Sequence, residues 1–362
     1  MVAVVVAGCR WHFAELPPDA SPDAEPDAPP LALACNTPVK VADAPLGAKL
    51  SAAALSSSAA AAWLAPNGQL VLGRVTFFAA DQVIGQAGAN PQQVGFSQVT
   101  VAGVGNFYAG AYTQNGQTFA QLADADLHGM GSAAVLPQLL GGARAIVATG
   151  NSTGPIAAVT TITMSTNQTV IYGIAADGSL SPPIALASGN PIAQSSLTNV
   201  GDRIAIVNVS SVNNCFVRTL DLGIQSASAT TGWGTANQCT QPQLGYSPGR
   251  QDALLIRHDL TDGDLNHVLG TRNGVTYTIP GESRLRNPGN EPRPVGVADG
   301  YWVSYETGGT LEAAHVDFAG TVGTVAVLGP LADPTAHGTV VVAGEPYAIW
   351  VQDGLELAHL CP

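Results

Sequence analysis

The sequence predicts an all-β fold built from one repeated hairpin unit. Apolar runs of four to eight residues are interrupted by Gly, Asn, Asp or Pro, a pattern typical of strands joined by turns. No long run combines a 3.6-residue period with helix caps. The clearest unit lies within 299–320, where strands expected at 301–305 and 310–318 flank the Gly308-Gly309 turn. Alternating strands on either side of such a turn indicate an antiparallel hairpin.

Composition supports a large folded domain and argues against nucleic acid as a partner. The 362-residue chain is 46% hydrophobic and 11% charged, so it can bury a sizeable core. Its formal net charge is −13, and its 13 Lys and Arg residues are scattered along the chain. A protein that binds a phosphate backbone needs these residues clustered.

The N-terminus carries a short apolar run, Val2–Gly8, followed by Cys9. The sequence Val6-Ala7-Gly8-Cys9 resembles the lipobox of bacterial lipoproteins, in which the cysteine is lipidated and becomes the first residue. The resemblance implies this role for Cys9. Only eight residues precede Cys9 and none is basic, so we expect residues 1–8 to be the remnant of a truncated signal peptide. An ordinary apolar strand with a chance cysteine is the alternative.

Residues 9–34 are predicted to form a lipid-anchored stalk rich in Pro, Asp and Ala. Leu16–Pro30 has no apolar face to bury, and its prolines and repelling acids favour an extended, solvated spacer. Anchor, stalk and domain in this order resemble a surface lipoprotein. Arg10 stands where Asp would favour inner-membrane retention, so the resemblance implies the outer membrane, with the domain facing the periplasm or the cell surface.

Residues 35–362 contain seven hairpin units of similar length. The predicted starts of the second strand in each unit are Ala59, Val104, Ile156, Asp202, Asp252, Gly300 and Glu345. Their spacings of 45 to 52 residues resemble those of β-propeller blades. The sequence lacks Trp-Asp and kelch signatures, so the resemblance is to propellers in general. It implies a seven-bladed β-propeller, with a six-bladed propeller or a β-sandwich array as alternatives.

The last unit lacks one strand, which the N-terminal part of the domain can supply. Strands expected at 345–351 and 355–360 are followed only by the end of the chain. A strand at 38–44 would therefore complete the last blade. Pairing the first strand with the last blade closes the ring and leaves fewer exposed sheet edges.

Cys9 aside, four cysteines remain, and they allow three pairings. In the propeller topology, Cys35 and Cys361 lie at one face of the ring. Cys215 begins a third strand, and Cys239 is expected in the loop leaving that unit, at the opposite face. The resemblance thus implies Cys35–Cys361 and Cys215–Cys239 disulfides and an oxidising compartment. Free buried thiols are the alternative.

One motif resembles a hydrolase nucleophile and another a metal-binding loop, but each is better explained as a turn. Residues 245–249 match the G-x-S-x-G pattern of hydrolases, yet Pro248 lacks the N–H that an oxyanion hole needs. Asp259, Asp262 and Asp264 form a weak metal candidate, because their spacing differs from that of a calcium-binding loop. We therefore expect no catalytic residues, no metal and no cofactor.

Long loops on one face supply the candidate binding residues. Trp233, Arg284, Arg286 and Asp262 are predicted to lie on loops of the same face, where a rigid scaffold can present them. Aromatic residues within strands are instead expected to pack between blades. These are Trp63, Tyr108, Trp302, Tyr305 and Trp350.

By analogy with the fold, the sequence indicates a lipid-anchored, monomeric, non-enzymatic module that binds or scaffolds a protein or a glycan in the cell envelope. One alternative is a propeller glycosidase or lyase, which would need paired carboxylates along the ring axis. Another is a structural subunit of an outer-membrane assembly complex.

Overall fold

The structure is a computed structural model of the 362-residue chain. It describes residues 33–42, 50–55, 58–64, 70–76, 83–86, 100–104, 107–114, 117–125, 129–137, 143–151, 154–163, 168–186, 192–201, 203–210, 212–221 and 226–362. Cys9, the predicted signal-peptide remnant and the stalk up to residue 32 lie outside the described residues. No helix in the described part of the chain has the length and hydropathy needed to cross a membrane.

The described residues form seven antiparallel sheets. The first sheet contains β2 (Leu50–Ala54), β3 (Ser58–Leu64), β4 (Leu70–Thr76) and β5 (Val83–Gln86). The second contains β6 (Thr100–Val104), β7 (Phe107–Gln114), β8 (Gln117–Asp124) and β9 (Gly129–Val135). The third contains β10 (Ala143–Asn151), β11 (Gly154–Thr163), β12 (Gln168–Ala175) and β13 (Ile184–Leu186).

In the next two sheets the outer strand is split into two short pieces. The fourth sheet contains β14 (Ile192–Asn199), β15 (Ile204–Ser210), β16 (Cys215–Asp221), β17 (Ser226–Ala227) and β18 (Thr231–Trp233). The fifth contains β19 (Cys239–Tyr246), β20 (Asp252–Asp259), β21 (Leu265–Asn273), β22 (Thr276–Thr278) and β23 (Ser283–Arg286).

The last two sheets complete the circle. The sixth contains β24 (Asn290–Gly296), β25 (Gly300–Thr307), β26 (Thr310–Asp317) and β27 (Val322–Pro330). The seventh contains β28 (His337–Val342), β29 (Glu345–Val351), β30 (Leu355–His359) and, from the start of the domain, β1 (Val39–Ala42).

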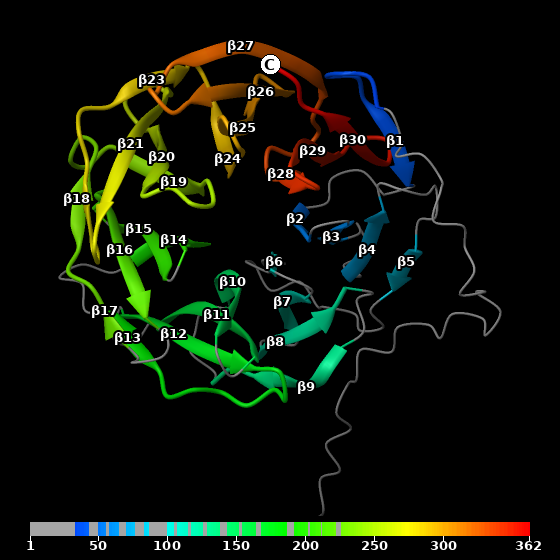
Figure 1. The fold of residues 1–362 in the computed structure, drawn as a ribbon, viewed down its shortest axis with the longest axis vertical. Coiled ribbons are helices and arrows are strands. Elements are labelled where there is room, and N and C mark those ends of the chain that lie inside the picture. Colours follow the sequence, from blue (N-terminus) through cyan, green and yellow to red (C-terminus); the bar gives the residue numbers. More distant parts are fainter. Residues whose placement is uncertain are drawn as a thin grey trace, which may run out of the picture.

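The sheets are arranged as a ring around a central opening (Figure 1). Their first strands contact one another in a closed circuit, from β2 through β6, β10, β14, β19, β24 and β28 back to β2. This arrangement confirms the prediction of an all-β propeller. The second strands begin at Ser58, Phe107, Gly154, Ile204, Asp252, Gly300 and Glu345, each within three residues of its predicted start.

The first strand of the domain joins the last sheet. β1 runs antiparallel to β30, with Val39 opposite Leu357 and Lys40 opposite Glu356 (Figure 1). Cys35, just before β1, forms a disulfide with Cys361, just after β30, and their Cα atoms are 5.4 Å apart. This is one of the two pairings that the propeller topology implies.

The core lies between neighbouring sheets. Trp302 and Trp350 belong to one cluster that joins the sixth, seventh and first sheets, with exposed fractions of 2% and 1%. Tyr108 and Tyr305 are also buried, as the expected packing role requires, whereas the side chain of Trp63 lies outside the description. Ala59, Ala60 and Ala61 are fully buried in β3, so sheets there meet through small side chains.

Removing the ring-closing disulfide should destabilise the protein more than removing the other one. The chain-entropy model gives about 5.8 kcal/mol for the separation of 326 residues between Cys35 and Cys361, and about 3.4 kcal/mol for the 24 between Cys215 and Cys239. We expect the Cys35→Ser, Cys361→Ser variant to melt several degrees below the Cys215→Ser, Cys239→Ser variant in differential scanning calorimetry. An equal or smaller drop would contradict this account of ring closure.

Candidate functional site

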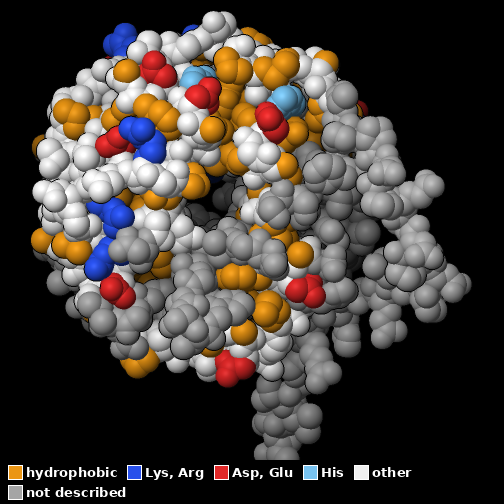
Figure 2. Space-filling model, viewed as in Figure 1, with side chains coloured by type: hydrophobic (Ala, Val, Ile, Leu, Met, Phe, Trp, Pro, Cys, Tyr) orange, Lys and Arg blue, Asp and Glu red, His pale blue; other side chains and the backbone are white. Residues whose placement is uncertain are grey.

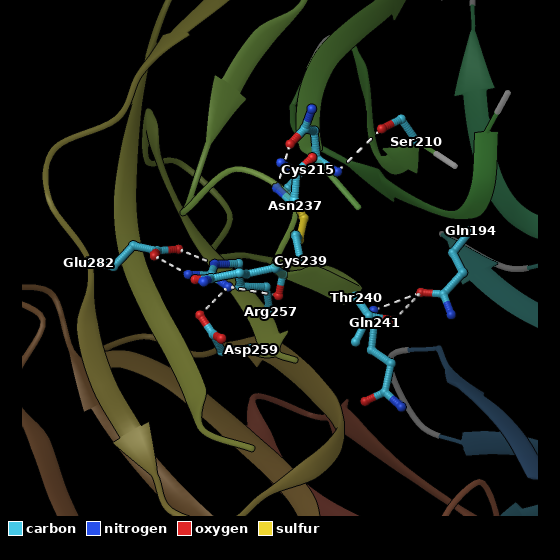
Figure 3. Close-up of a disulfide and its surroundings, with 12 residues drawn as sticks. Gln194, Ser210, Cys215, Asn237, Cys239, Thr240, Gln241, Arg257, Asp259 and Glu282 are labelled. Carbon is cyan, nitrogen blue, oxygen red and sulfur yellow. Dashed lines mark hydrogen bonds and ion pairs between the residues drawn. A yellow bond between two sulfur atoms is a disulfide. The ribbon is translucent and has the colours of Figure 1, made fainter. Parts of the chain in front are cut away.

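The second disulfide joins the fourth and fifth sheets. Cys215 begins β16 and Cys239 begins β19, and their Cα atoms are 5.7 Å apart (Figure 3). The pairing is the one predicted, but Cys239 is the first residue of a strand rather than part of a loop. Its N–H donates to the Asn213 carbonyl at 2.9 Å. The start of β19, the first strand of the fifth sheet, therefore lies next to the turn that precedes β16.

A buried arginine lies beside this disulfide (Figure 3). The side chain of Arg257, on β20, is 1% exposed. Its Nε and Nη2 donate to the two carboxylate oxygens of Glu282, both at 2.8 Å. Its Nη1 donates to Asp259 Oδ2 at 2.8 Å and to the Gln238 carbonyl at 3.3 Å. The guanidinium therefore fastens the connections before β19 and before β23 to the end of β20.

The surroundings of Arg257 favour the ionised forms of Arg257 and Asp259. Burial favours the neutral form of Asp259, yet the Thr261 N–H and Arg257 outweigh it and lower the pKa of this carboxyl. Burial likewise opposes the charge of Arg257, but Glu282 and Asp259 raise the pKa of the guanidinium. Gly234 covers the cluster with φ of 75°, and a Cβ there would come within 2.9 Å of Arg257 Cδ. The cluster is thus a filled structural site without room for a ligand.

A second polar feature runs along the inner strands. Gln194 Oε1 accepts the Gln241 N–H at 2.7 Å, and Gln241 Oε1 accepts the Glu291 N–H at 2.9 Å (Figure 3 shows the first contact). Gln241 and Glu291 have φ of 49° and 47° and lie at register shifts of β19 and β24. Each bulge therefore presents a backbone donor to the preceding sheet. The sequence analysis missed these residues, although Gln241-Pro242 and Glu291-Pro292 recur 50 residues apart.

The series of inner polar contacts continues at the start of β28. His337 is fully buried, and its Nδ1 lies 3.0 Å from Ser304 Oγ. Burial, with a smaller effect of Arg293, holds the pKa of His337 well below its usual range. The imidazole is therefore neutral and acts as a hydrogen-bonding core residue.

The sequence-based prediction was wrong about the position of one residue of the binding patch, Trp233. Trp233 lies in β18 rather than in a loop, and its side chain is only 6% exposed. It packs with Cys215, Leu255 and Tyr277 in the core between the fourth and fifth sheets. Segment 281–286 is also partly strand, because β23 pairs with β21. The sequence did not show that the outer strands of these sheets are split.

The other patch residues lie near the turn between β20 and β21, on what we call the Asp262 face of the ring. Arg284 forms an ion pair with the buried carboxylate of Asp264, and the Arg284 side chain is 60% exposed. Asp262 is exposed, and its Oδ1 accepts the Asp264 N–H at 3.0 Å. Arg284 and Asp262 therefore share Asp264 as a partner. Arg286 Nη2 instead donates to Glu312 of the next sheet at 2.8 Å.

The weak metal candidate does not form a common site. Asp259 faces Arg257, Asp264 faces Arg284, and Asp262 caps the turn. Among the described residues, these three carboxylates are not within metal-binding distance of one another.

The G-x-S-x-G segment is a turn before β20, as expected: Ser247 is buried and donates to the Val297 carbonyl at 2.7 Å.

The opposite end of the sheets, which we call the Cys361 face, carries separate charged pairs. Arg250 Nη2 lies 2.7 Å from Asp252 Oδ2 at the start of β20 and stacks over Phe318. His315 lies 3.3 Å from Asp299, and His359 lies 3.0 Å from Glu345. Figure 2 shows histidine and acidic side chains next to each other on the surface of the ring, and a hollow at its centre.

Replacing Arg257 should be costly, because Asp259 and Glu282 would be left without their partner. We expect Arg257→Met to lower the free energy of unfolding by about 3–5 kcal/mol. The matched variant Arg250→Met removes a partly exposed ion pair, whose Asp252 still accepts the Thr271 hydroxyl, and should cost about 0–1 kcal/mol. Urea denaturation of both variants measures the difference, and equal losses would mean that the buried cluster is not a structural support.

No family model and no curated protein matches the sequence, but solved structures resemble the fold. Hydrazine synthase from Kuenenia stuttgartiensis aligns with 9% identity and a TM-score of 0.61 over 88% of this chain and 96% of that one. An ulvan lyase of a polysaccharide lyase family aligns with 8% identity and a TM-score of 0.59 over 88% and 94%. The SapL1 lectin, solved with α-methyl fucoside, aligns with 14% identity and a TM-score of 0.50 over 80% and 99%. At these identities the likeness shows the fold alone.

Proposed function

We propose that this protein is a non-enzymatic, monomeric module that binds a glycan through the Asp262 face of its propeller. The observation that carries the proposal is that exposed Arg284 and exposed Asp262 both contact the buried Asp264, Arg284 through its carboxylate and Asp262 through its N–H. Sugar hydroxyls both donate and accept hydrogen bonds, so a guanidinium next to a carboxylate matches them. The lectin and the lyase with the same fold support a glycan over other ligands.

The rigid base below this pair favours binding without large rearrangement. Arg257 fixes the connection before β23 through Glu282 and the end of β20 through Asp259. The Cys215–Cys239 disulfide fixes the neighbouring sheet. A preorganised surface loses less conformational entropy on binding than mobile loops do.

The distribution of carboxylates favours binding over glycoside hydrolysis. Hydrolysis of a glycosidic bond generally requires two carboxyl groups on either side of the bond. Within the described strands that line the ring axis, Glu291 is the single acidic residue. Its carboxylate is already engaged by Gln241 and Arg293.

We further propose a seven-bladed ring as the scaffold. It is supported by the seven sheets of the described chain and by the closed circuit of their first strands. The pairing of β1 with β30 supplies the strand that the last blade lacks.

Once a glycan array has identified a ligand, Arg284→Ala should weaken its binding by about 1 kcal/mol or more, about fivefold in Kd, because the donors of the patch are lost. Arg250→Ala is the matched control, since Arg250 is also partly exposed but lies on the Cys361 face. Isothermal titration calorimetry measures both. An unchanged Kd for Arg284→Ala would move the site elsewhere, and capture of a protein without glycan binding would favour the scaffolding alternative.

Lipid anchoring in the outer membrane through Cys9 is a separate part of the proposal, supported by the sequence Val6-Ala7-Gly8-Cys9 and the segment behind it. Expressed in a bacterial host from its genomic context, the protein should incorporate a labelled fatty acid and sediment with outer membranes. Cys9→Ser should release it. A wild-type protein that stays soluble and unlabelled would disprove the anchor while leaving glycan binding open.

A further inference from the structure

A histidine lies beside the ring-closing disulfide on the Cys361 face. His359 Nδ1 is 3.5 Å from Cys361 Sγ, and its Nε2 is 3.0 Å from Glu345 Oε2. The two sulfur atoms and the nearest imidazole nitrogen all lie within 4.8 Å of one another. The second disulfide is not part of any such group among the described residues.

The geometry points to a redox-exchangeable zinc site: when the Cys35–Cys361 disulfide is reduced, Cys35, Cys361 and His359 bind Zn²⁺ and hold the ring closed in its place. Two thiolates and an imidazole are ligands that Zn²⁺ prefers, and a site with three protein ligands leaves one position for water or a ligand.

The distances fit a tetrahedral ion. With Zn–S of about 2.3 Å and Zn–N of about 2.0–2.1 Å, a sulfur and a nitrogen ligand lie about 3.5 Å apart. Cys361 Sγ and His359 Nδ1 already have this separation. The two sulfur atoms need to move apart to about 3.8 Å by side-chain rotation.

The orientation of His359 also suits a metal ligand. With the proton on Nε2, the imidazole donates to Glu345 and leaves the Nδ1 lone pair directed toward the sulfur atoms. Zinc-binding histidines commonly donate their other N–H to a carboxylate in this way. Cys35 is exposed and His359 is 21% exposed, so an ion can reach the site from solvent.

Asn36 keeps the two cysteines together when the disulfide is open. Its backbone N–H donates to the His359 carbonyl at 2.8 Å. Its side chain donates to the Cys361 carbonyl at 3.1 Å and accepts the Cys361 N–H at 3.2 Å. Asn36 has φ of 53°, a conformation that asparagine tolerates well. These contacts do not involve sulfur, so they remain after reduction.

The exchange requires a thiol or phosphine reductant, which supplies two electrons and becomes oxidised. Reduction breaks the S–S bond, and each sulfur takes up one proton to give two thiols. Zn²⁺ then displaces one proton from each thiol, while His359 contributes its lone pair without losing a proton.

The test uses the full-length protein, reduced with a phosphine that is then removed without oxygen, and Co²⁺ as a spectroscopic probe for zinc. We expect a thiolate-to-cobalt charge-transfer band and the intense d–d bands of a tetrahedral site, both abolished by Zn²⁺. His359→Ala should weaken Co²⁺ binding at least tenfold. Glu345→Gln, which alters a positioning residue, should weaken it about tenfold and keep the tetrahedral spectrum.

The two cysteine pairs provide matched controls. Cys215→Ser with Cys239→Ser should keep the bands, whereas Cys35→Ser with Cys361→Ser should lose them. Zn²⁺ should raise the melting temperature of the reduced wild type, and should refold it if reduction alone unfolds it. The inference is overturned if the bands are absent, if they persist in the Cys35→Ser, Cys361→Ser variant, if His359→Ala binds Co²⁺ as tightly as the wild type, or if Zn²⁺ leaves the reduced protein no more stable.

Discussion

The pairing of β1 with β30 is the contact on which the whole ring depends. Each sheet buries its faces against two neighbours, so the seventh sheet must meet the first for any of them to have a complete core. The cluster containing Trp302 and Trp350 shows this directly, since it joins residues of the sixth, seventh and first sheets. If the two ends separated, unpaired edges and apolar faces would be exposed together. The Cys35–Cys361 bond and the contacts of Asn36 both prevent this separation.

A second constraint acts where the fourth and fifth sheets are joined, because the charged cluster of Arg257, Asp259 and Glu282 is buried between the segments that lead into β19 and β23. Taking Arg257, Asp259 and Glu282 out of water is unfavourable unless each has a well-placed partner. The bidentate contact with Glu282 and the contact with Asp259 provide this. Such a cluster has one satisfactory arrangement, so it determines how the chain enters β19 and β23. Arg284 is not part of this cluster: it pairs with the buried carboxylate of Asp264 while most of its side chain stays exposed.

The two faces of the ring thus carry different groups of residues. The Asp262 face, which we propose as the glycan-binding surface, has polar side chains above a buried ion cluster. The Cys361 face has the chain ends, one disulfide and the His359–Glu345 pair. The proposed binding surface and the ring closure therefore lie at opposite ends of the sheets, and a change in one need not disturb the other.

The sequence by itself determined the repeated architecture, and its resemblance to a propeller then implied both disulfide pairings. Gly and Asn turns fix where hairpins begin and end, so the starts of the second strands at Asp252, Gly300 and Glu345 could be predicted from local pattern. Only the tertiary structure decided which polar residues are exposed. Trp233 was predicted on the surface, but it lies in one piece of the split outer strand and its side chain is buried in the core. Glu282, the bidentate partner of Arg257, lies 25 residues away in the connection before β23, and Glu291, which Gln241 contacts, lies 50 residues away in the next sheet. Local sequence does not encode such distances, because they arise only when neighbouring blades pack together.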